Sequence, residues 1–146
     1  AWCELLHNSM SMTMTPLEYM TIALLAGDIE TVRRLHENGQ TFHNGDMFIA
    51  ATLDVFRYLH ENGAVLPKLY AYDMYYVLIL RDKIDMLKYA LKHHIGCVHP
   101  DLCTVAANGH FDALACLLEH ACPYNADDIL KTAGARVLRK HGIVLK

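Results

Sequence analysis

The stretch Arg34-Leu35-His36-Glu37-Asn38-Gly39 returns as Tyr58-Leu59-His60-Glu61-Asn62-Gly63, and the second His-Glu-Asn-Gly follows the first by 24 residues. A weaker version, Val137-Leu138-Arg139-Lys140-His141-Gly142, lies near the C-terminus. A unit repeated every ~20 to 50 residues predicts a solenoid, because each unit is too small to bury its own apolar face and must stack on its neighbours. Repeat chains of this kind usually bind other macromolecules.

The rest of the chain aligns with this stretch at one anchor position. Leu35 corresponds to Leu59, Ala90, Leu117 and Leu138, at steps of 24, 31, 27 and 21 residues. Before the first four anchors, apolar residues recur three and six or seven positions apart, which places them on one stripe of a helix. Five leucines of these stripes are expected to be buried between repeats: Leu35, Leu59, Leu87, Leu114 and Leu117.

Each repeat is predicted to hold two helices. A glycine follows the charged, outer helix, and Gly39, Gly63, Gly96 and Gly142 suit the left-handed backbone that ends a helix. A more apolar, inner helix comes first, and Thr15-Pro16-Leu17-Glu18 carries the start signal for the first of them. The inner helices are expected at residues 16–26, 46–51, 68–81, 101–108 and 126–133.

These observations predict a single all-α domain, a helix-turn-helix repeat solenoid of about four and a half repeats. The 146 residues are 53% hydrophobic, which is enough for a packed core. The repeats are placed at residues 15–40, 41–64, 65–97 and 98–123. Residues 1–14 are assigned as an N-terminal cap or remnant, and residues 124–146 as a C-terminal capping repeat.

Two stretches resemble ankyrin repeats: Ala106-Ala107-Asn108-Gly109-His110-Phe111-Asp112 and Glu119-His120-Ala121-Cys122-Pro123-Tyr124-Asn125. They are most similar to the short variant that is abundant in giant DNA viruses of amoebae and in some protists. The third repeat diverges, with Asp82-Lys83 where Asn-Gly-His is expected and His93-His94-Ile95 inserted before the glycine. The resemblance implies an ankyrin-like fold with reduced hairpin fingers and a non-enzymatic protein-interaction module. It implies a host-directed adaptor or decoy if the origin is viral.

Charge and hydropathy exclude several classes of protein. The net charge near -3, without a basic stripe, argues against a nucleic-acid partner. The longest apolar run, Tyr75 to Leu80, is far too short to span a bilayer, and no basic segment followed by an apolar one indicates a signal peptide. The chain starts at Ala1, which leaves open a lost initiator methionine or a longer upstream region. An odd number of cysteines, five, favours a reducing compartment and hence the cytoplasm, the host's if the protein is viral.

Cysteine and histidine crowd one part of the chain: Cys97, His99, Cys103, His110, Cys116, His120 and Cys122. Zinc sites usually show close Cys-x2-Cys or His-x3-His pairs, whereas these spacings follow the repeat. The cysteines are therefore interpreted as small apolar filler, and a small zinc-binding protein is an alternative that metal analysis would decide. The resemblance gives His110 a hydrogen bond to backbone in the turn. No phosphate loop, hydrolase elbow or HExxH motif is present, so we expect no enzymatic activity, metal or cofactor.

A contact surface is expected along the connections between repeats. Half of the eight tyrosines lie between Lys68 and Tyr76, in the repeat with the longest step. Tyrosine is favoured at interfaces because it buries a large area with little rotamer freedom to lose, although the segment can instead pack on itself. The expected contact edge consists of Phe42, His43, Tyr70, Tyr72, His99 and Tyr124.

The partner is expected to be another protein, bound by a monomer or weak oligomer. The alternative is a structural subunit of a virion or complex that self-assembles through the flat faces of the repeats. Concentration-dependent oligomers in light scattering would favour that alternative.

Overall fold

A computed structural model describes residues 14–141, which form two compact units, one ending at Leu66 and one beginning at Pro67. Within residues 14–141 there are ten α-helices and no strand, which confirms the prediction of an all-α chain. None of these helices is long and apolar enough to cross a bilayer. Except for Met14, the expected N-terminal cap lies outside the described residues. Gly142 also lies outside them.

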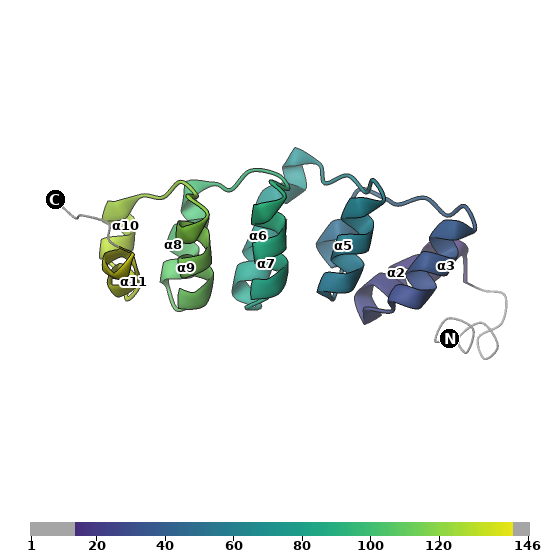
Figure 1. The fold of residues 1–146 in the computed structure, drawn as a ribbon, viewed down its shortest axis with the longest axis horizontal. Coiled ribbons are helices and arrows are strands. Elements are labelled where there is room, and N and C mark those ends of the chain that lie inside the picture. The colour runs from purple at the N-terminus through teal and green to yellow at the C-terminus, as the bar shows by residue number, and fades with distance from the viewer. Residues whose placement is uncertain (1–13, 142–146) are drawn as a thin grey trace. The chain divides into compact units, whose positions relative to one another are not determined.

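The first unit contains four helices that pack as two neighbouring pairs (Figure 1). They are α2 (Pro16–Ala26), α3 (Ile29–Glu37), α4 (Asp46–Ile49) and α5 (Leu53–Glu61). Helices α2 and α5 each pack against both α3 and α4. The more apolar α2 and α4 therefore lie next to one another, as do the charged α3 and α5.

Helix α2 begins and ends where the sequence predicts. The Thr15 hydroxyl accepts a hydrogen bond from the Glu18 backbone nitrogen at 3.2 Å, and Pro16 fills the first helical position. Gly27 ends the helix in the left-handed conformation at φ 71°. A Cβ added at Gly27 would lie 2.6 Å from Cγ2 of Thr52, so this position requires glycine for its backbone angle and for space.

The second unit contains six helices in three pairs, which lie side by side (Figure 1). They are α6 (Lys68–Leu80), α7 (Ile84–Lys92), α8 (Pro100–Ala107), α9 (Phe111–Glu119), α10 (Ala126–Leu130) and α11 (Ala135–Lys140). Helix α8 packs against α6 and α10, and α9 packs against α7 and α11. Each helix thus meets its counterpart in the next pair, which makes two layers.

Helix α4 ends at Ile49, two residues before the end of the expected span of 46–51. The chain turns away at this point: the backbone nitrogen of Ala51 donates to the carbonyl of Leu24 in α2 at 3.1 Å. Thr52 then adopts an extended conformation and caps α5. A hydrogen bond to the neighbouring helix replaces the last turn.

Helix α10 also ends early, at Leu130 instead of residue 133. The Thr132 hydroxyl donates to the Ile129 carbonyl at 2.6 Å and accepts from the Gly134 nitrogen at 3.1 Å, which closes a turn. A Cβ on Gly134 would lie 2.6 Å from Cβ of Ala107. Glycine here lets α8 approach closely, and the turn, rather than further helix, occupies the space.

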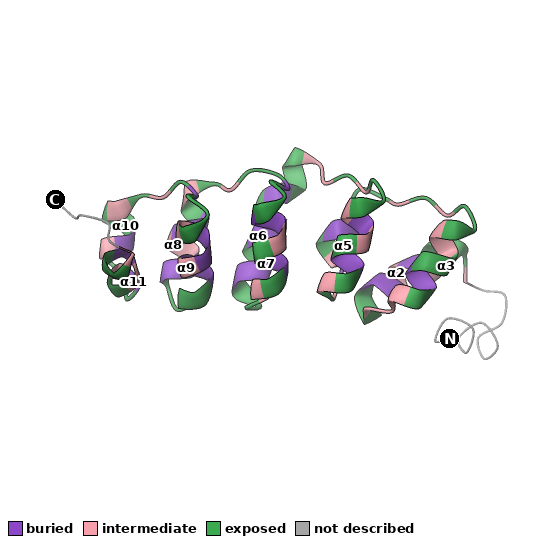
Figure 2. Cartoon of the chain, viewed as in Figure 1, coloured by how far each residue is buried: buried purple, intermediate pink, exposed green. Residues whose placement is uncertain are grey.

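The buried residues lie mostly on the helices, whereas much of the connecting loops is exposed or half-buried (Figure 2). The prediction of a buried leucine stripe is confirmed in four of its five members: Leu59, Leu87, Leu114 and Leu117. It is wrong for Leu35, which is half-buried. Among the described residues, α3 has an outer-helix neighbour only on the α5 side, so the stripe of the first pair is covered less completely.

The first left-handed residue after α3, α5, α7 and α9 stands four positions beyond the anchor. It is Gly39 (φ 95°) and Gly63 (φ 83°) in the first unit, but His94 (φ 53°) and Ala121 (φ 56°) in the second. The prediction that Gly96 ends the third outer helix is therefore wrong.

The hydrogen bonds explain this correction. The backbone nitrogen of Ile95 donates to the carbonyl of Ala90 at 2.9 Å, and that of Cys122 donates to Leu117 at 3.1 Å. Ile95 and Cys122 are thus equivalent, and both are buried. The segment around His94 is consequently not an insertion before a glycine, because it matches the end of α9 position by position as far as Ile95.

Candidate functional site

The expected contact edge is divided between the two units. Phe42 and His43 belong to the first unit, whereas Tyr70, Tyr72, His99 and Tyr124 belong to the second. Tyr70 and Tyr72 were expected on an edge formed by the connections, and this is wrong: both lie in the first two turns of α6, within the inner helix expected at residues 68–81. Within the second unit the structure brings two of the predicted residues, Tyr72 and His99, together.

Tyr72 stands at the centre of a group of rings that we call the tyrosine patch: Tyr72, Tyr76 and His99. The rings of Tyr72 and Tyr76 stack with centroids 6.1 Å apart and planes at 21°, as expected for residues four apart on a helix. The His99 ring meets Tyr72 edge-on, with centroids 6.0 Å apart. Each tyrosine is 37% exposed. The patch is therefore a partly open aromatic surface contributed by two helix pairs.

The tyrosine patch belongs to a longer apolar stripe on α6. Leu69 is 82% exposed and Leu80 is 42% exposed. Steps of three, four and four residues connect Leu69, Tyr72, Tyr76 and Leu80, which is the spacing of one helical face. Large apolar side chains aligned on an exposed face are typical of interaction sites.

His99 is held in place at the start of α8. Its Nδ1 accepts a hydrogen bond from the backbone nitrogen of Asp101 at 3.1 Å, which makes it the N-cap residue. The Nδ1 atom that accepts this bond carries no proton, so Nε2 is the donor of the ring. His99 can therefore offer a partner both an aromatic edge and an N–H group.

The first unit has its own aromatic cluster, which sequence reasoning missed in part. The Phe42 ring stacks on His36 with centroids 4.6 Å apart, and Nδ1 of His36 lies 2.8 Å from the hydroxyl of Tyr58. All three side chains are half-buried. These contacts pack the loop after α3 against α5, so Phe42 has a structural role here. Recognising it required the pairing of α3 with α5, which gives His36 and Tyr58 a common surface.

His43 and Asp46 form the turn that leads into α4. The backbone nitrogen of His43 donates to the Asp46 carboxylate at 2.8 Å. Burial raises the pKa of Asp46, and the hydrogen bond from His43 opposes that rise. The His43 side chain itself is exposed.

A shallow hollow of about 250 Å³ lies between α3 and α5. Its polar lining carries both signs of charge, and each of its arginines pairs within its own helix: Arg33 lies 3.6 Å from Glu30, and Arg57 lies 3.8 Å from Asp54. Exposed pairs of this type contribute little to stability or specificity. We interpret this face as solvated surface.

The cysteines of the second unit differ in accessibility. Cys103, Cys116 and Cys122 are buried, Cys97 is exposed, and all four are free thiols. The Cys103 thiol donates to the Pro123 carbonyl at 3.4 Å. Burial raises the pKa of Cys103 to about 12 and that of Cys116 to about 11. Residues 14–141 contain no group of three or more His, Cys, Asp or Glu side chains arranged to hold a metal ion.

We expect iodoacetamide at pH 8 to alkylate Cys97 at least about tenfold faster than Cys103, Cys116 or Cys122, because the exposed thiolate is the reactive species. Peptide mass spectrometry after timed quenching measures the four rates. In 8 M urea the four rates should become similar. Fast modification of Cys116 in the native protein would contradict the burial described above.

His110 does not make the backbone contact that the resemblance implied for its side chain. Its Nδ1 lies 3.3 Å from the carboxylate of Asp82, in the turn of the preceding helix pair. Asp82 has φ 52°, in a turn where other pairs have Gly27 or Gly109. The pair thus connects two neighbouring turns of the second unit. Comparison with protein-family models, with curated proteins and with solved structures finds no match to this chain.

Proposed function

We propose that this chain is a non-enzymatic protein-interaction module of ankyrin-like helix-turn-helix repeats that binds its partner through the tyrosine patch. The observation that carries the proposal is the alignment of partly exposed rings, Tyr72, Tyr76 and His99, beside the exposed Leu69 and Leu80. The exposed thiol of Cys97 is compatible with a reducing compartment such as the cytoplasm.

The repeat assignment is supported by the recurrence of one local plan. An inner helix, a tight turn, an outer helix of nine residues and a left-handed residue follow one another around the anchors Leu35, Leu59, Ala90 and Leu117. Sequence and backbone repeat in the same register, as in repeat proteins whose core is constant and whose surface varies. The proposed ankyrin-like, host-directed class rests on the resemblance quoted above.

The chemistry of the patch favours a partner with apolar or cationic side chains. Tyrosine rings accept both kinds of contact, because their faces attract guanidinium and ammonium groups. Two exposed carboxylates accompany the rings: Asp73 follows Tyr72 in α6, and Asp101 lies beside His99. An arginine or lysine next to an aliphatic residue would satisfy both features.

The test is a double variant, Tyr72→Ala/Tyr76→Ala, compared with wild type in quantitative affinity capture and then in titration of the purified partner. We expect binding to weaken by about 2 kcal/mol or more, because rings at the centre of an interface dominate its affinity. Circular dichroism should show an unchanged helix content, since alanine favours helices. The matched control is Arg57→Ala/Glu61→Ala, which removes two exposed side chains from α5 and should bind as wild type does.

Three outcomes would contradict the proposal. A double variant that unfolds would make the rings part of the core. A double variant that folds and binds normally would place the contact elsewhere. Wild-type oligomers that grow with concentration in light scattering and disappear in the double variant would instead assign the patch to self-assembly.

A further inference from the structure

Four asparagines of the chain are each followed by glycine: Asn38-Gly39, Asn44-Gly45, Asn62-Gly63 and Asn108-Gly109. In such a pair the backbone nitrogen of the glycine can attack the carboxamide carbon of the asparagine, because no side chain on the glycine hinders the approach. A bond forms between this nitrogen and Cγ, the bond from Cγ to Nδ2 breaks, and ammonia leaves with the proton of the glycine nitrogen. Water then opens the cyclic imide at either carbonyl, which gives aspartate or isoaspartate.

Two of the four asparagine side chains are held by the helix that precedes them. Nδ2 of Asn62 donates to the Tyr58 carbonyl at 2.8 Å, and Nδ2 of Asn108 donates to the Thr104 carbonyl at 2.8 Å. Both asparagines are C-cap residues, of α5 and α8. The carboxamide must leave its carbonyl partner before it can turn towards the glycine, so the hydrogen bond opposes the reaction.

The attacking nitrogen is engaged after α3 and α5. The Gly39 nitrogen donates to the His36 carbonyl at 3.0 Å, and the Gly63 nitrogen donates to the His60 carbonyl at 3.3 Å. Both glycines have the left-handed conformation that ends a helix. A nitrogen that donates its proton must break that bond before it can lose the proton to solvent. The pair after α3 is therefore shielded once, and the pair after α5 is shielded at both reacting groups.

The pair Asn44-Gly45 lies in the turn before α4 and has neither kind of protection. Among residues 14–141, the Asn44 side chain and the Gly45 nitrogen have no hydrogen-bond partner. Asn44 is exposed, and a Cβ added at Gly45 would meet nothing within 4 Å, so the space around the reacting groups is open. Gly45 has φ -92°, outside the left-handed region in which the other three glycines are held.

We propose that Asn44 is a site of spontaneous deamidation in the folded protein, whereas the fold protects the other three Asn-Gly pairs. The product carries a new negative charge between His43 and the buried Asp46. This turn is closed by the His43 nitrogen, which donates to the Asp46 carboxylate at 2.8 Å, and by the Asp46 nitrogen, which donates to the His43 carbonyl at 3.1 Å. Isoaspartate adds one carbon to the main chain inside the turn and moves these groups out of register. The site does not depend on the tyrosine patch or on the function proposed above.

The test compares the four asparagines in the folded protein and in urea. Samples incubated in mildly alkaline buffer are digested under acidic conditions, and peptide mass spectrometry follows the gain in mass when the amide NH2 is replaced by OH. In the folded protein we expect Asn44 to react at least about tenfold faster than Asn38, Asn62 or Asn108. In urea the four rates should agree within about threefold, because each asparagine then has the same glycine neighbour and no fixed hydrogen bond.

Gly45→Ala is the decisive variant. Its methyl group hinders attack on Asn44 but is compatible with φ -92° and with the open space around Gly45. We expect the reaction at Asn44 to slow by about tenfold or more, while Tm stays within about 3 °C of wild type. The comparison of the four wild-type sites does not depend on this variant. Equal rates at the four asparagines of the folded protein, a faster rate at any of the other three, or an unchanged rate at Asn44 in Gly45→Ala would overturn the proposal.

Discussion

Replacing Leu59 by alanine is expected to lower the free energy of unfolding by about 2–5 kcal/mol, as for other large-to-small changes in a close-packed core. Leu59 is 0% exposed and lies on the face of α5 that packs inside the first unit. Truncation removes apolar contacts and leaves a cavity that the neighbouring helices cannot fully close. Urea denaturation followed by circular dichroism measures the change.

The matched control is Leu35→Ala. The sequence treats Leu35 and Leu59 as equivalent anchors, but the structure leaves Leu35 half-buried. Truncation of Leu35 should therefore lower the free energy of unfolding by only about 1 kcal/mol, because folding removes less of its apolar area from water than of Leu59. Equal losses at the two positions would mean that the stripe of α3 is covered as fully as that of α5.

Much of the helix plan could be predicted because local signals agreed with one another. The capping signal at Thr15, the apolar stripes and the anchor spacing all pointed to the same boundaries, and α2 has the predicted bounds. Where two signals disagreed, the glycine was the poorer guide: four residues beyond Ala90 stands His94, and the spacing, not Gly96, marks the helix end. The partial exposure of Leu35 could not be predicted, since it depends on which helices are neighbours.

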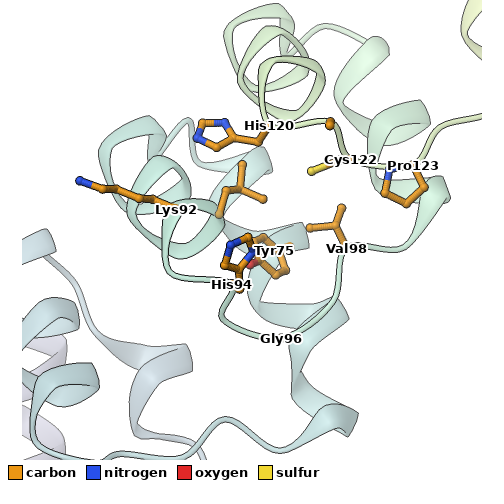
Figure 3. A pocket seen from close by; sticks show the side chains of 10 residues that line it. Tyr75, Lys92, His94, Gly96, Val98, His120, Cys122 and Pro123 are labelled. Atoms are coloured by element: carbon orange, nitrogen blue, oxygen red, sulfur yellow. The ribbon is translucent and has the colours of Figure 1, made fainter.

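The candidate site could be predicted only in part, for the same reason. Sequence reasoning named Tyr72 and His99 from their aromatic character, and the packing of α6 against α8 brings them together. It left out Tyr76, because the expected edge was restricted to the connections between repeats, whereas Tyr72 and Tyr76 share one face of the helix α6. A hollow of about 380 Å³ in the second unit is lined by residues of different helix pairs, Tyr75 and Leu91 from one and His120 from the next (Figure 3), and nothing in the local sequence specifies the distance between them.

Replacing Gly27 by alanine adds only one methyl group, but we expect it to lower the free energy of unfolding by about 2–3 kcal/mol. The new Cβ would lie 2.6 Å from Cγ2 of Thr52, and the backbone has φ 71°. Thr52 cannot turn away freely, because its hydroxyl accepts a hydrogen bond from the Val55 nitrogen and caps α5. The substitution therefore combines left-handed strain with damage to the cap of a neighbouring helix.

Gly63→Ala separates these two contributions. Gly63 has φ 83°, but a Cβ there would meet nothing within 4 Å. Only the backbone strain remains, so the loss should be about 1 kcal/mol. Adding Thr52→Ser, which removes Cγ2 but keeps the capping hydroxyl, should recover much of the stability lost in Gly27→Ala and none of that lost in Gly63→Ala. Urea denaturation of the two single and two double variants measures the difference, and an equal response to Thr52→Ser at both glycines would rule out the steric contact between the α2–α3 turn and the start of α5.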